Sequence, residues 1–298
     1  MKFEPFFSSK KALDKSFIFY RDSEQRKEFR NHIESLWKKY HPYADENFLI
    51  EASNHFHQRS WEMFLACSFL EQGFKLIHQP TKGPDIKFEL KDSIAWCETT
   101  TATRGDNAVD KMHWGTSEKM VVMDVPEEHM ITRLTSAIND KYKIFKEKYL
   151  GAIVKEDEPF IIALNRYEVE YMDSDIPLIL SAVFGVGHLM INLKTGDSKY
   201  GSRPTVKKKN KTNVETTYFC NDRFKEISAI IYSTDSVINL IDKYNGAEIS
   251  IVHNPFAKNK LPRGLFKFDR EYVADGDKIV DIRRAQISSS SRYPATLK

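Results

Sequence analysis

Apolar and polar residues alternate along one stretch in the first third of the chain. Ile86, Phe88 and Leu90 are apolar and the residues between them are charged, which is the period of two typical of a half-buried strand. A second apolar stretch, residues 94–100, follows after the turn-forming pair 92–93. The pattern therefore predicts an antiparallel hairpin.

The expected pairing of this hairpin places two carboxylates close together. With a two-residue loop at 92–93, residue 85 lies opposite residue 100 and residue 87 opposite residue 98. Directly opposed side chains share one face of a sheet, so the acidic residues 85 and 98 are expected on the same face. Neighbouring carboxylates repel each other unless a cation or a shared proton holds them. Oxygen ligands of this kind suit Mg²⁺ or Mn²⁺, so Asp85 and Glu98 are the predicted metal ligands.

Helical periodicity precedes the hairpin. Apolar residues at spacings of three and four predict a helix over 24–40 and a helical region over 45–72 that is broken near 53–54. Glu62 lies beside the core-facing stripe of the second region. Two interpretations stay open for Glu62, namely an ion pair with Arg59 and a position next to the metal.

Further elements follow the same reasoning. A short strand is predicted before the hairpin, and an amphipathic helix, a strand buried on both faces, a short apolar helix and two more strands are predicted after it. These elements are expected at 74–78, 130–149, 159–164, 176–184, 227–233 and 248–253. A long polar stretch between 106 and 128 is typical of an active-site loop or an insertion.

The hairpin and the helix before it resemble the PD-(D/E)XK, or restriction-endonuclease-like, nuclease superfamily. That family's pattern is a helix that often bears a glutamate, a strand, Pro-Asp at the start of a second strand, and Glu-x-Lys on a third. The residues that match it here are Glu62, Pro84-Asp85 and Glu98-Thr99-Thr100. The resemblance covers roughly residues 55–165. The chain departs from the family at Thr100, which stands where the lysine is expected, and Lys87 and Lys141 are candidates to replace that lysine.

The resemblance implies an α/β fold whose central mixed sheet is flanked by helices. It implies a DNA endonuclease with Mg²⁺ or Mn²⁺ held by Asp85 and Glu98, assisted from the helix by Glu62, with Thr100 orienting the attacking water. The alternative is a catalytically inactive nuclease-like fold that binds nucleic acid or a protein partner. A third hypothesis is an enzyme of another class that uses the carboxylate pair for acid/base chemistry. The choice of DNA or RNA and the oligomeric state stay open.

The expected organisation is an N-terminal helical arm (1–54), an α/β domain with a C-terminal extension (55–283) and a disordered tail (284–298) that contains four consecutive serines. No apolar run is long enough for a membrane span, and the first residues lack the apolar core of a signal peptide. We therefore expect a cytoplasmic protein that does not bind membranes. The three cysteines lie in apolar surroundings without metal-ligand spacing.

Net charge adds little, because +3 over 298 residues does not identify a nucleic-acid-binding protein. Five basic residues are nevertheless concentrated between 203 and 211, in a predicted loop. The loop is either a solvated surface segment or a flap that contacts phosphates. The chain also looks like a group of bacterial proteins of unassigned function that share Gly-Pro-Asp and a His-Asn-Pro, here 253–255. For that tripeptide, a turn that ends a strand and a substrate contact are both open.

Overall fold

A computed structural model describes residues 3–79, 83–103, 125–169, 177–208, 210–236, 249–283 and the backbone of 292–294. The α-helices are α1 (Lys15–Asp22), α2 (Lys27–Tyr40), α3 (Phe48–Ala52), α4 (Phe56–Glu71), α5 (Glu127–Ile144) and α6 (Leu178–Phe184). A 3-10 turn precedes α2, a π-helical turn (Phe145–Tyr149) extends α5, and two further 3-10 turns are Phe6–Ser8 and Asp222–Phe224.

Eight of the described strands form one mixed sheet, in the order β1-β2-β3-β8-β9-β10-β11-β12. Its strands are β1 (Ile86–Glu89), β2 (Ile94–Thr101), β3 (Phe160–Asn165), β8 (Ile227–Ser233), β9 (Ile249–His253), β10 (Arg270–Asp275), β11 (Lys278–Asp281) and β12 (Arg292–Pro294). Two small antiparallel pairs complete the set: β4 (Val186–Ile191) with β5 (Ser198–Ser202), and β6 (Thr205–Lys207) with β7 (Asn213–Glu215). The expectation of an α/β class with a central mixed sheet is confirmed.

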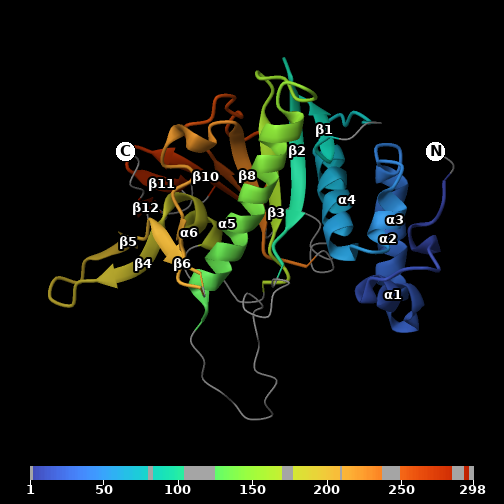
Figure 1. Cartoon of the computed structure of the whole chain (residues 1–298), viewed down its shortest axis with the longest axis horizontal. Helices are drawn as coiled ribbons and strands as arrows, with labels where there is room; N and C mark the ends of the chain where they lie inside the picture. Colours follow the sequence, from blue (N-terminus) through green and yellow to red (C-terminus); the bar gives the residue numbers. More distant parts are fainter. Residues whose placement is uncertain are drawn as a thin grey trace, which may run out of the picture.

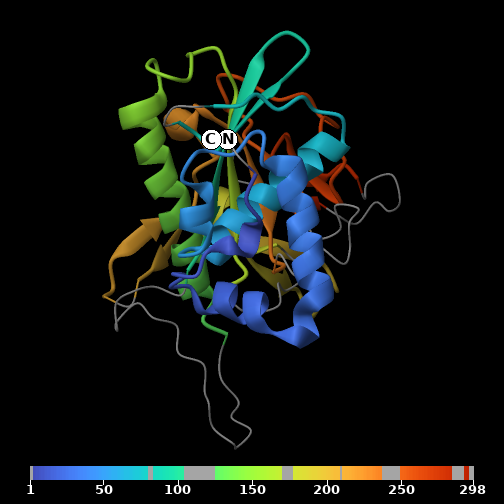
Figure 2. The same cartoon turned by 90° about the vertical axis from the view of Figure 1, so that its right-hand side faces the viewer.

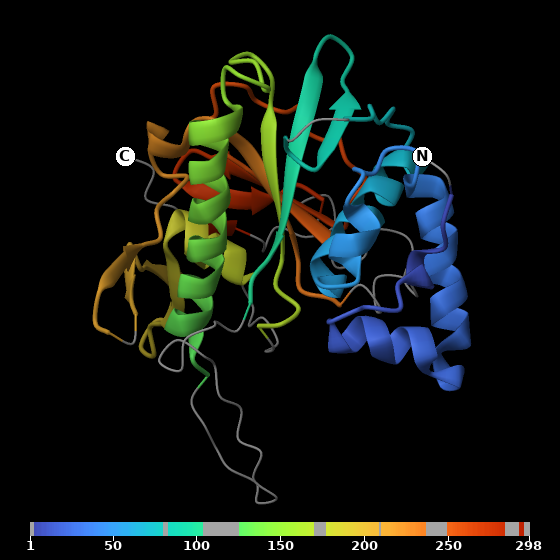
Figure 3. The same ribbon diagram turned by 45° about the vertical axis from the view of Figure 1, so that its right-hand side comes forward.

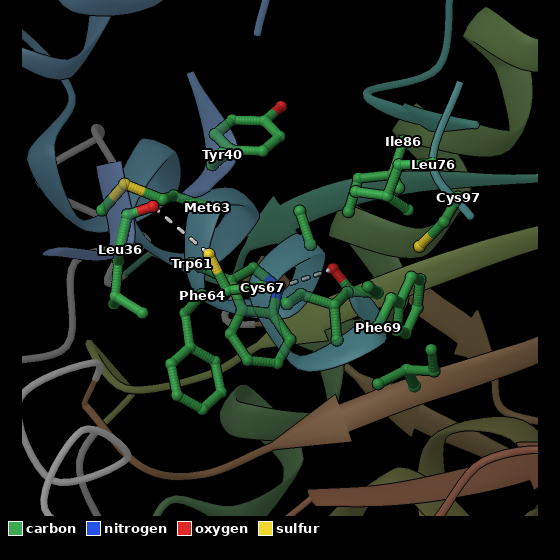
Figure 4. Close-up of a cluster of buried hydrophobic side chains, with 14 of the residues drawn as sticks. Leu36, Tyr40, Trp61, Met63, Phe64, Cys67, Phe69, Leu76, Ile86 and Cys97 are labelled. Carbon is green, nitrogen blue, oxygen red and sulfur yellow. Dashed lines mark hydrogen bonds between the residues drawn. The ribbon is translucent and has the colours of Figure 1, made fainter. Parts of the chain in front are cut away.

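Two hydrophobic layers enclose the sheet (Figures 1 and 3). The N-terminal helices α1 to α4 pack on one face, and α5 and α6 pack on the other. The view in Figure 2 looks onto the N-terminal helices. On their side Trp61 of α4 is fully buried and donates its indole N–H to the carbonyl oxygen of Ala163 in β3, at 3.1 Å (Figure 4). Helices of the predicted N-terminal arm (1–54) contribute to the same hydrophobic core as this face of the sheet.

The central strand of the sheet and the helices before it agree with the sequence predictions. All six residues of β3 are buried, which agrees with the prediction of a strand covered on both faces. β3 runs parallel to both β2 and β8, and α5 supplies the connection between β2 and β3 that a parallel pair requires. The predicted helices 24–40 and 45–72, with the break near 53–54, are also present.

The predicted pairing of the hairpin is wrong by two residues. Ile86 pairs with Cys97 and Glu89 with Ile94, and Leu90 donates its N–H to the carbonyl of Ser93 at 2.8 Å. The turn is thus centred one residue earlier than 92–93, which moves every partner by two positions. Because side chains alternate with a period of two, the shift keeps each residue on its expected face. Extended by one residue, the observed register sets residue 85 opposite residue 98.

Other expectations are met in part. The predicted strand 74–78 forms only an isolated bridge, between Leu76 and Phe88. Most of the polar stretch 106–128 lies outside the described residues. The same holds for the predicted disordered tail apart from Arg292–Pro294, which form β12 against β11.

Within the described ranges, no helix combines the length and apolarity needed to cross a lipid bilayer. Cys67, Cys97 and Cys220 are all buried free thiols. Burial raises the pKa of Cys67 to about 12, so this thiol has little thiolate character at neutral pH. The expectation that the cysteines pack as small apolar side chains is confirmed.

Candidate functional site

Asp85 lies at the edge of the sheet, one residue before β1 begins. Its Oδ2 accepts two hydrogen bonds from Thr99 of β2, from the backbone N–H and from the hydroxyl group, each at 2.7 Å. The Gly-Pro before Asp85 removes one backbone donor and restricts the chain at the strand entry. Asp85 is therefore held in one orientation against β2, and its Oδ1 lies 3.8 Å from Nη1 of Arg59.

Glu98 is on β2 and is 4 % exposed. Its Oε1 accepts a hydrogen bond of 2.6 Å from the ammonium group of Lys141, on α5. Its Oε2 is buried and has no hydrogen-bond donor in the part of the chain that the structure describes. A buried carboxylate oxygen without a partner is costly, so this atom marks a place where a cation or a donor belongs.

Glu62 reaches the same edge of the sheet from α4, on the opposite face. It is 1 % exposed. Oε1 accepts a hydrogen bond from the hydroxyl of Tyr40 at 2.6 Å, and Oε2 accepts one from Arg59 at 2.5 Å. The ion pair with Arg59 that the sequence suggested is present, and both oxygens of Glu62 are satisfied.

Arg59 links these acidic groups. Its Nη1 lies 2.5 Å from Oε2 of Glu62 and 3.8 Å from Oδ1 of Asp85. The guanidinium group also pairs with the exposed acids Glu51 and Asp45. Since a guanidinium offers five N–H donors in a fixed plane, Arg59 can hold Glu62 and Asp85 in a constant relation to each other.

The electrostatics of the site disfavour two charged glutamates. Burial and the nearby charge of Asp85 raise the pKa of Glu62 to about 8, against the opposing effect of Arg59. Burial and Asp85 likewise raise the pKa of Glu98 to about 8, although Lys141 favours its charged form. Perturbed carboxyl groups that cluster at one edge of a sheet are a common feature of functional sites.

Asp85 and Glu98 suit a hard divalent cation such as Mg²⁺, which binds through one or two carboxylates and keeps several waters. Oε2 of Glu98, which has no hydrogen-bond partner among the described residues, and Oδ1 of Asp85, which has only the 3.8 Å contact with Arg59, are oxygen ligands of that kind. No group of three or more potential metal ligands occurs among the described residues. An ion held by these two carboxylates would take its remaining ligands from water and substrate.

The structure also gives the positions of the remaining candidate residues, Thr100, Lys87 and Lys141. Thr100 is two residues beyond Glu98 on β2, so it projects from the same face. Its neighbour Thr99, which the sequence analysis did not select, is the residue that holds Asp85. Lys87 lies over the ring of Trp96, 4.5 Å from the centroid. Of the two candidate lysines, only Lys141 contacts a site carboxylate.

Tyr40 and Arg59 also belong to the site. The helical spacing placed Arg59 near Glu62, but its second acidic neighbour, Asp85, follows only from tertiary structure. Tyr40 ends α2, 22 residues before Glu62, and no local pattern connects the two. Long-range contacts of this kind leave no signal in a single sequence.

The basic run between 203 and 211 forms the β6–β7 hairpin rather than an irregular loop. Val206 is buried against the α5 side of the sheet, while Lys207 and Lys211 are exposed and Lys208 is half-buried. Arg203 pairs instead with Glu127 at the start of α5, at 3.0 Å. The hairpin therefore presents lysines near the N-terminal end of the helix whose other end carries the site lysine.

No protein-family model matches the chain, and neither the curated proteins nor the solved structures contain a significant match.

Proposed function

We propose that this chain is a divalent-metal-dependent nuclease that hydrolyses DNA phosphodiester bonds. The observation that carries the proposal is the environment of Glu98. Its carboxylate is buried between a lysine and an aspartate, and one of its oxygens has no partner within the described residues. A purely structural ion pair needs neither the second acid nor the orphan oxygen.

The roles follow from the contacts. Asp85 and Glu98 would hold Mg²⁺ or Mn²⁺, which when bound polarises the phosphate and lowers the pKa of an attacking water. Lys141 places a positive charge at Glu98 and can stabilise the negative charge that develops on the phosphate. Lys141 thus takes the part that Thr100 cannot, because a hydroxyl group carries no charge. Thr100 projects toward the same side and is placed to orient water.

The order of elements supports the same proposal. From α4, the chain passes through the bridge at Leu76 to β1 and β2, then to α5 and β3. A helix, three extended segments, a helix and a further strand is the arrangement that the resemblance to PD-(D/E)XK nucleases implies. Glu62 stands on the first of these helices and β2 carries Glu98, as the family pattern expects. The lysine moves from the strand to α5.

Glu62 acts as a positioning residue in this proposal. Both of its oxygens are occupied by Tyr40 and Arg59, so it does not offer a free ligand. Its negative charge holds Arg59, and Arg59 in turn faces Asp85. Outer groups that orient a ligand typically change metal affinity or activity by about 10–100-fold when they are removed.

The test is cleavage of supercoiled, linear and single-stranded DNA in Mg²⁺, Mn²⁺ and chelator. We expect wild type to nick or degrade DNA with metal only, and Asp85→Asn and Glu98→Gln to abolish this activity. Glu89→Gln is the matched control, since Glu89 is an exposed acid on the same hairpin and its loss should leave cleavage unchanged.

Absence of cleavage in every condition, with a folded wild type, would contradict the proposal. If such a protein still binds DNA with equal affinity in wild type and both carboxylate variants, the inactive binding module becomes the better explanation. Cleavage of RNA but not DNA would keep the site and change the substrate.

A further inference from the structure

A small pocket lies on the far side of the sheet centre from the carboxylates. It is formed where β8, β9 and β10 meet the loop that follows β9, and it includes His253, Asn254, Lys260 and Arg263. Its volume is about 180 Å³. The His-Asn-Pro tripeptide of the sequence analysis thus borders a cavity and also ends a strand.

Asn254 lines the pocket and is held in place by hydrogen bonds. Asn254 is 2 % exposed, and its side-chain amide donates to the carbonyls of Phe224 and Ile227 at 3.0 and 2.9 Å. Its Oδ1 accepts the N–H of Phe256 at 3.0 Å. Every polar group of this side chain is used, so Asn254 shapes the loop and takes no part in binding a ligand.

His253 is oriented by a buried acid. Its Nε2 lies 3.0 Å from Oε1 of Glu271, which is 1 % exposed. The same Oε1 accepts the N–H of Gly264 at 2.7 Å, and Arg283 lies 3.0 Å from Oε2. Although burial disfavours its charge, the hydrogen bonds from His253 and Gly264 hold the pKa of Glu271 below its ordinary value. Glu271 is therefore ionised and accepts a hydrogen bond from Nε2 of His253, which fixes the orientation of the ring.

Lys260 and Arg263 are exposed at the mouth of this pocket. Neither forms an ion pair or a side-chain hydrogen bond with any described residue, whereas the nearby Lys258 pairs with Glu156 at 2.8 Å. Glu271 lies behind His253, and Arg283 balances its charge at 3.0 Å. The mouth of the pocket therefore carries two positive charges, neither of which is paired with an acid among the described residues.

We propose that this pocket binds a small oxyanion, specifically a phosphate group. Arg and Lys are the side chains that proteins use most often for phosphate, and Arg can contact two of its oxygens at once. A divalent cation is disfavoured by the charge of Lys260 and Arg263. The volume lies below the range of about 300–1,000 Å³ typical of sites for larger organic ligands, which favours a single phosphate group.

The pocket is separate from the carboxylate site. His253 is in register with Ala229 of β8, which pairs with Ile161 and, through it, with Cys97. Three strand spacings of about 4.8 Å give a separation of about 14 Å from β2. The proposal does not rest on nuclease activity, and the phosphate can come from a free phosphorylated molecule or from the terminus of a nucleic acid.

The test is calorimetric titration of the full chain with inorganic phosphate at constant ionic strength. Saturable binding is expected in wild type, and Lys260→Ala with Arg263→Ala should weaken it by about tenfold or more. Both residues are exposed, so the double variant should fold. A matched control is Lys267→Ala with Lys278→Ala, which removes two exposed lysines elsewhere and should leave binding unchanged.

Titration with 5′-phosphorylated and 5′-hydroxyl trinucleotides identifies the source of the phosphate. If the phosphorylated trinucleotide binds more tightly than both the 5′-hydroxyl form and inorganic phosphate, the ligand is a nucleic-acid terminus. If it binds no more tightly than inorganic phosphate, the ligand is a free anion. Absence of saturable binding in wild type, or equal affinity in wild type and the Lys260/Arg263 double variant, would overturn the proposal. Neither outcome depends on whether the protein cleaves DNA.

Discussion

Glu62 and Glu98 are both buried glutamates, and they differ in how their oxygens are used. Glu62 shares its two oxygens between Tyr40 and Arg59. Glu98 gives one oxygen to Lys141 and keeps the other without a partner among the described residues. Burial and Asp85 raise both pKa values to about 8, so electrostatics alone does not distinguish the two residues.

The difference lies in hydrogen bonding. A carboxylate with both oxygens occupied contributes to the arrangement of its neighbours, whereas one with a free buried oxygen can accept a ligand. Glu98 is therefore the proposed metal ligand and Glu62 the positioning residue. This assignment predicts unequal effects for the same Glu→Gln change at the two sites.

The largest expected effect is at the metal ligands. Asp85→Asn and Glu98→Gln should each reduce metal-dependent DNA cleavage by on the order of 10³-fold, because each removes a ligand charge that the proposed ion needs. The measurement is the initial rate of nicking of supercoiled DNA in Mg²⁺. Rates within threefold of wild type in either variant, with DNA binding intact, would refute the ligand assignment.

Lys141→Met should lower the cleavage rate by about 10²-fold, because it removes the charge beside Glu98 while retaining much of the side chain's apolar length. Lys87→Met is the matched control. Lys87 lies over Trp96 on the same hairpin and contacts no site carboxylate, so its loss should leave the rate unchanged. The opposite result would assign the catalytic lysine to Lys87.

Glu62→Gln should reduce cleavage by about tenfold, the smaller loss typical of an outer positioning group. The loss should appear as a weaker affinity for Mg²⁺, so that raising the metal concentration partly restores the rate, since the ligands themselves are intact. The check is a rate profile against Mg²⁺ concentration. A loss as large as that of Glu98→Gln would end the distinction between the two glutamates.

Replacement of Lys207, Lys208 and Lys211 by Ala should weaken DNA binding without changing the rate at saturating DNA. These lysines are expected to contact phosphates, and each lost contact lowers the slope of log affinity against log salt by about one. The measurement is fluorescence anisotropy of labelled DNA across salt concentrations. An unchanged slope would show that these lysines do not contact DNA phosphates and that the hairpin is a solvated surface segment.

The smallest expected effect concerns stability and pH. Glu62 and Glu98 have pKa values near 8 in the folded state, against an ordinary value of 4.5. The folded state therefore binds more protons than the unfolded state between these values, and stability falls as pH rises from about 4.5 to 8. Wild type should melt about 3 °C or more lower at pH 8 than at pH 5 without metal.

Glu62→Gln with Glu98→Gln should flatten this dependence, because amides do not titrate. Melting temperatures measured by differential scanning calorimetry at the two pH values provide the check. Equal pH dependence in wild type and in the double variant would show that the two glutamates do not account for it.

Much of the fold follows from local pattern. The hairpin, the buried strand at 160–165 and the helices around it come from apolar periodicity, since a period of two or of 3.6 reports which face is buried. The turn at 91–92 was misplaced by one residue. Both Lys91-Asp92 and Asp92-Ser93 are plausible turn pairs, and only the hydrogen bond between Leu90 and Ser93 distinguishes them.

Some residues of the candidate site could be predicted from the sequence and others could not. Asp85 and Glu98 were predictable because their neighbours in sequence fix the strand and its faces. The contacts of Tyr40, Arg59 and Thr99 were not, because they depend on how α2 and α4 pack against the sheet edge. Lys141 was one of two candidate lysines, and its contact with Glu98 depends on the placement of α5.

The most direct test of the account is Mn²⁺ binding to the purified chain, measured by isothermal titration calorimetry at pH 8.5, where both glutamates are largely charged. We predict saturable binding in wild type, retained in Glu62→Gln and lost in Glu98→Gln. Equal Mn²⁺ binding in wild type and Glu98→Gln would contradict the assignment of Glu98 as a metal ligand, and with it the proposed nuclease site.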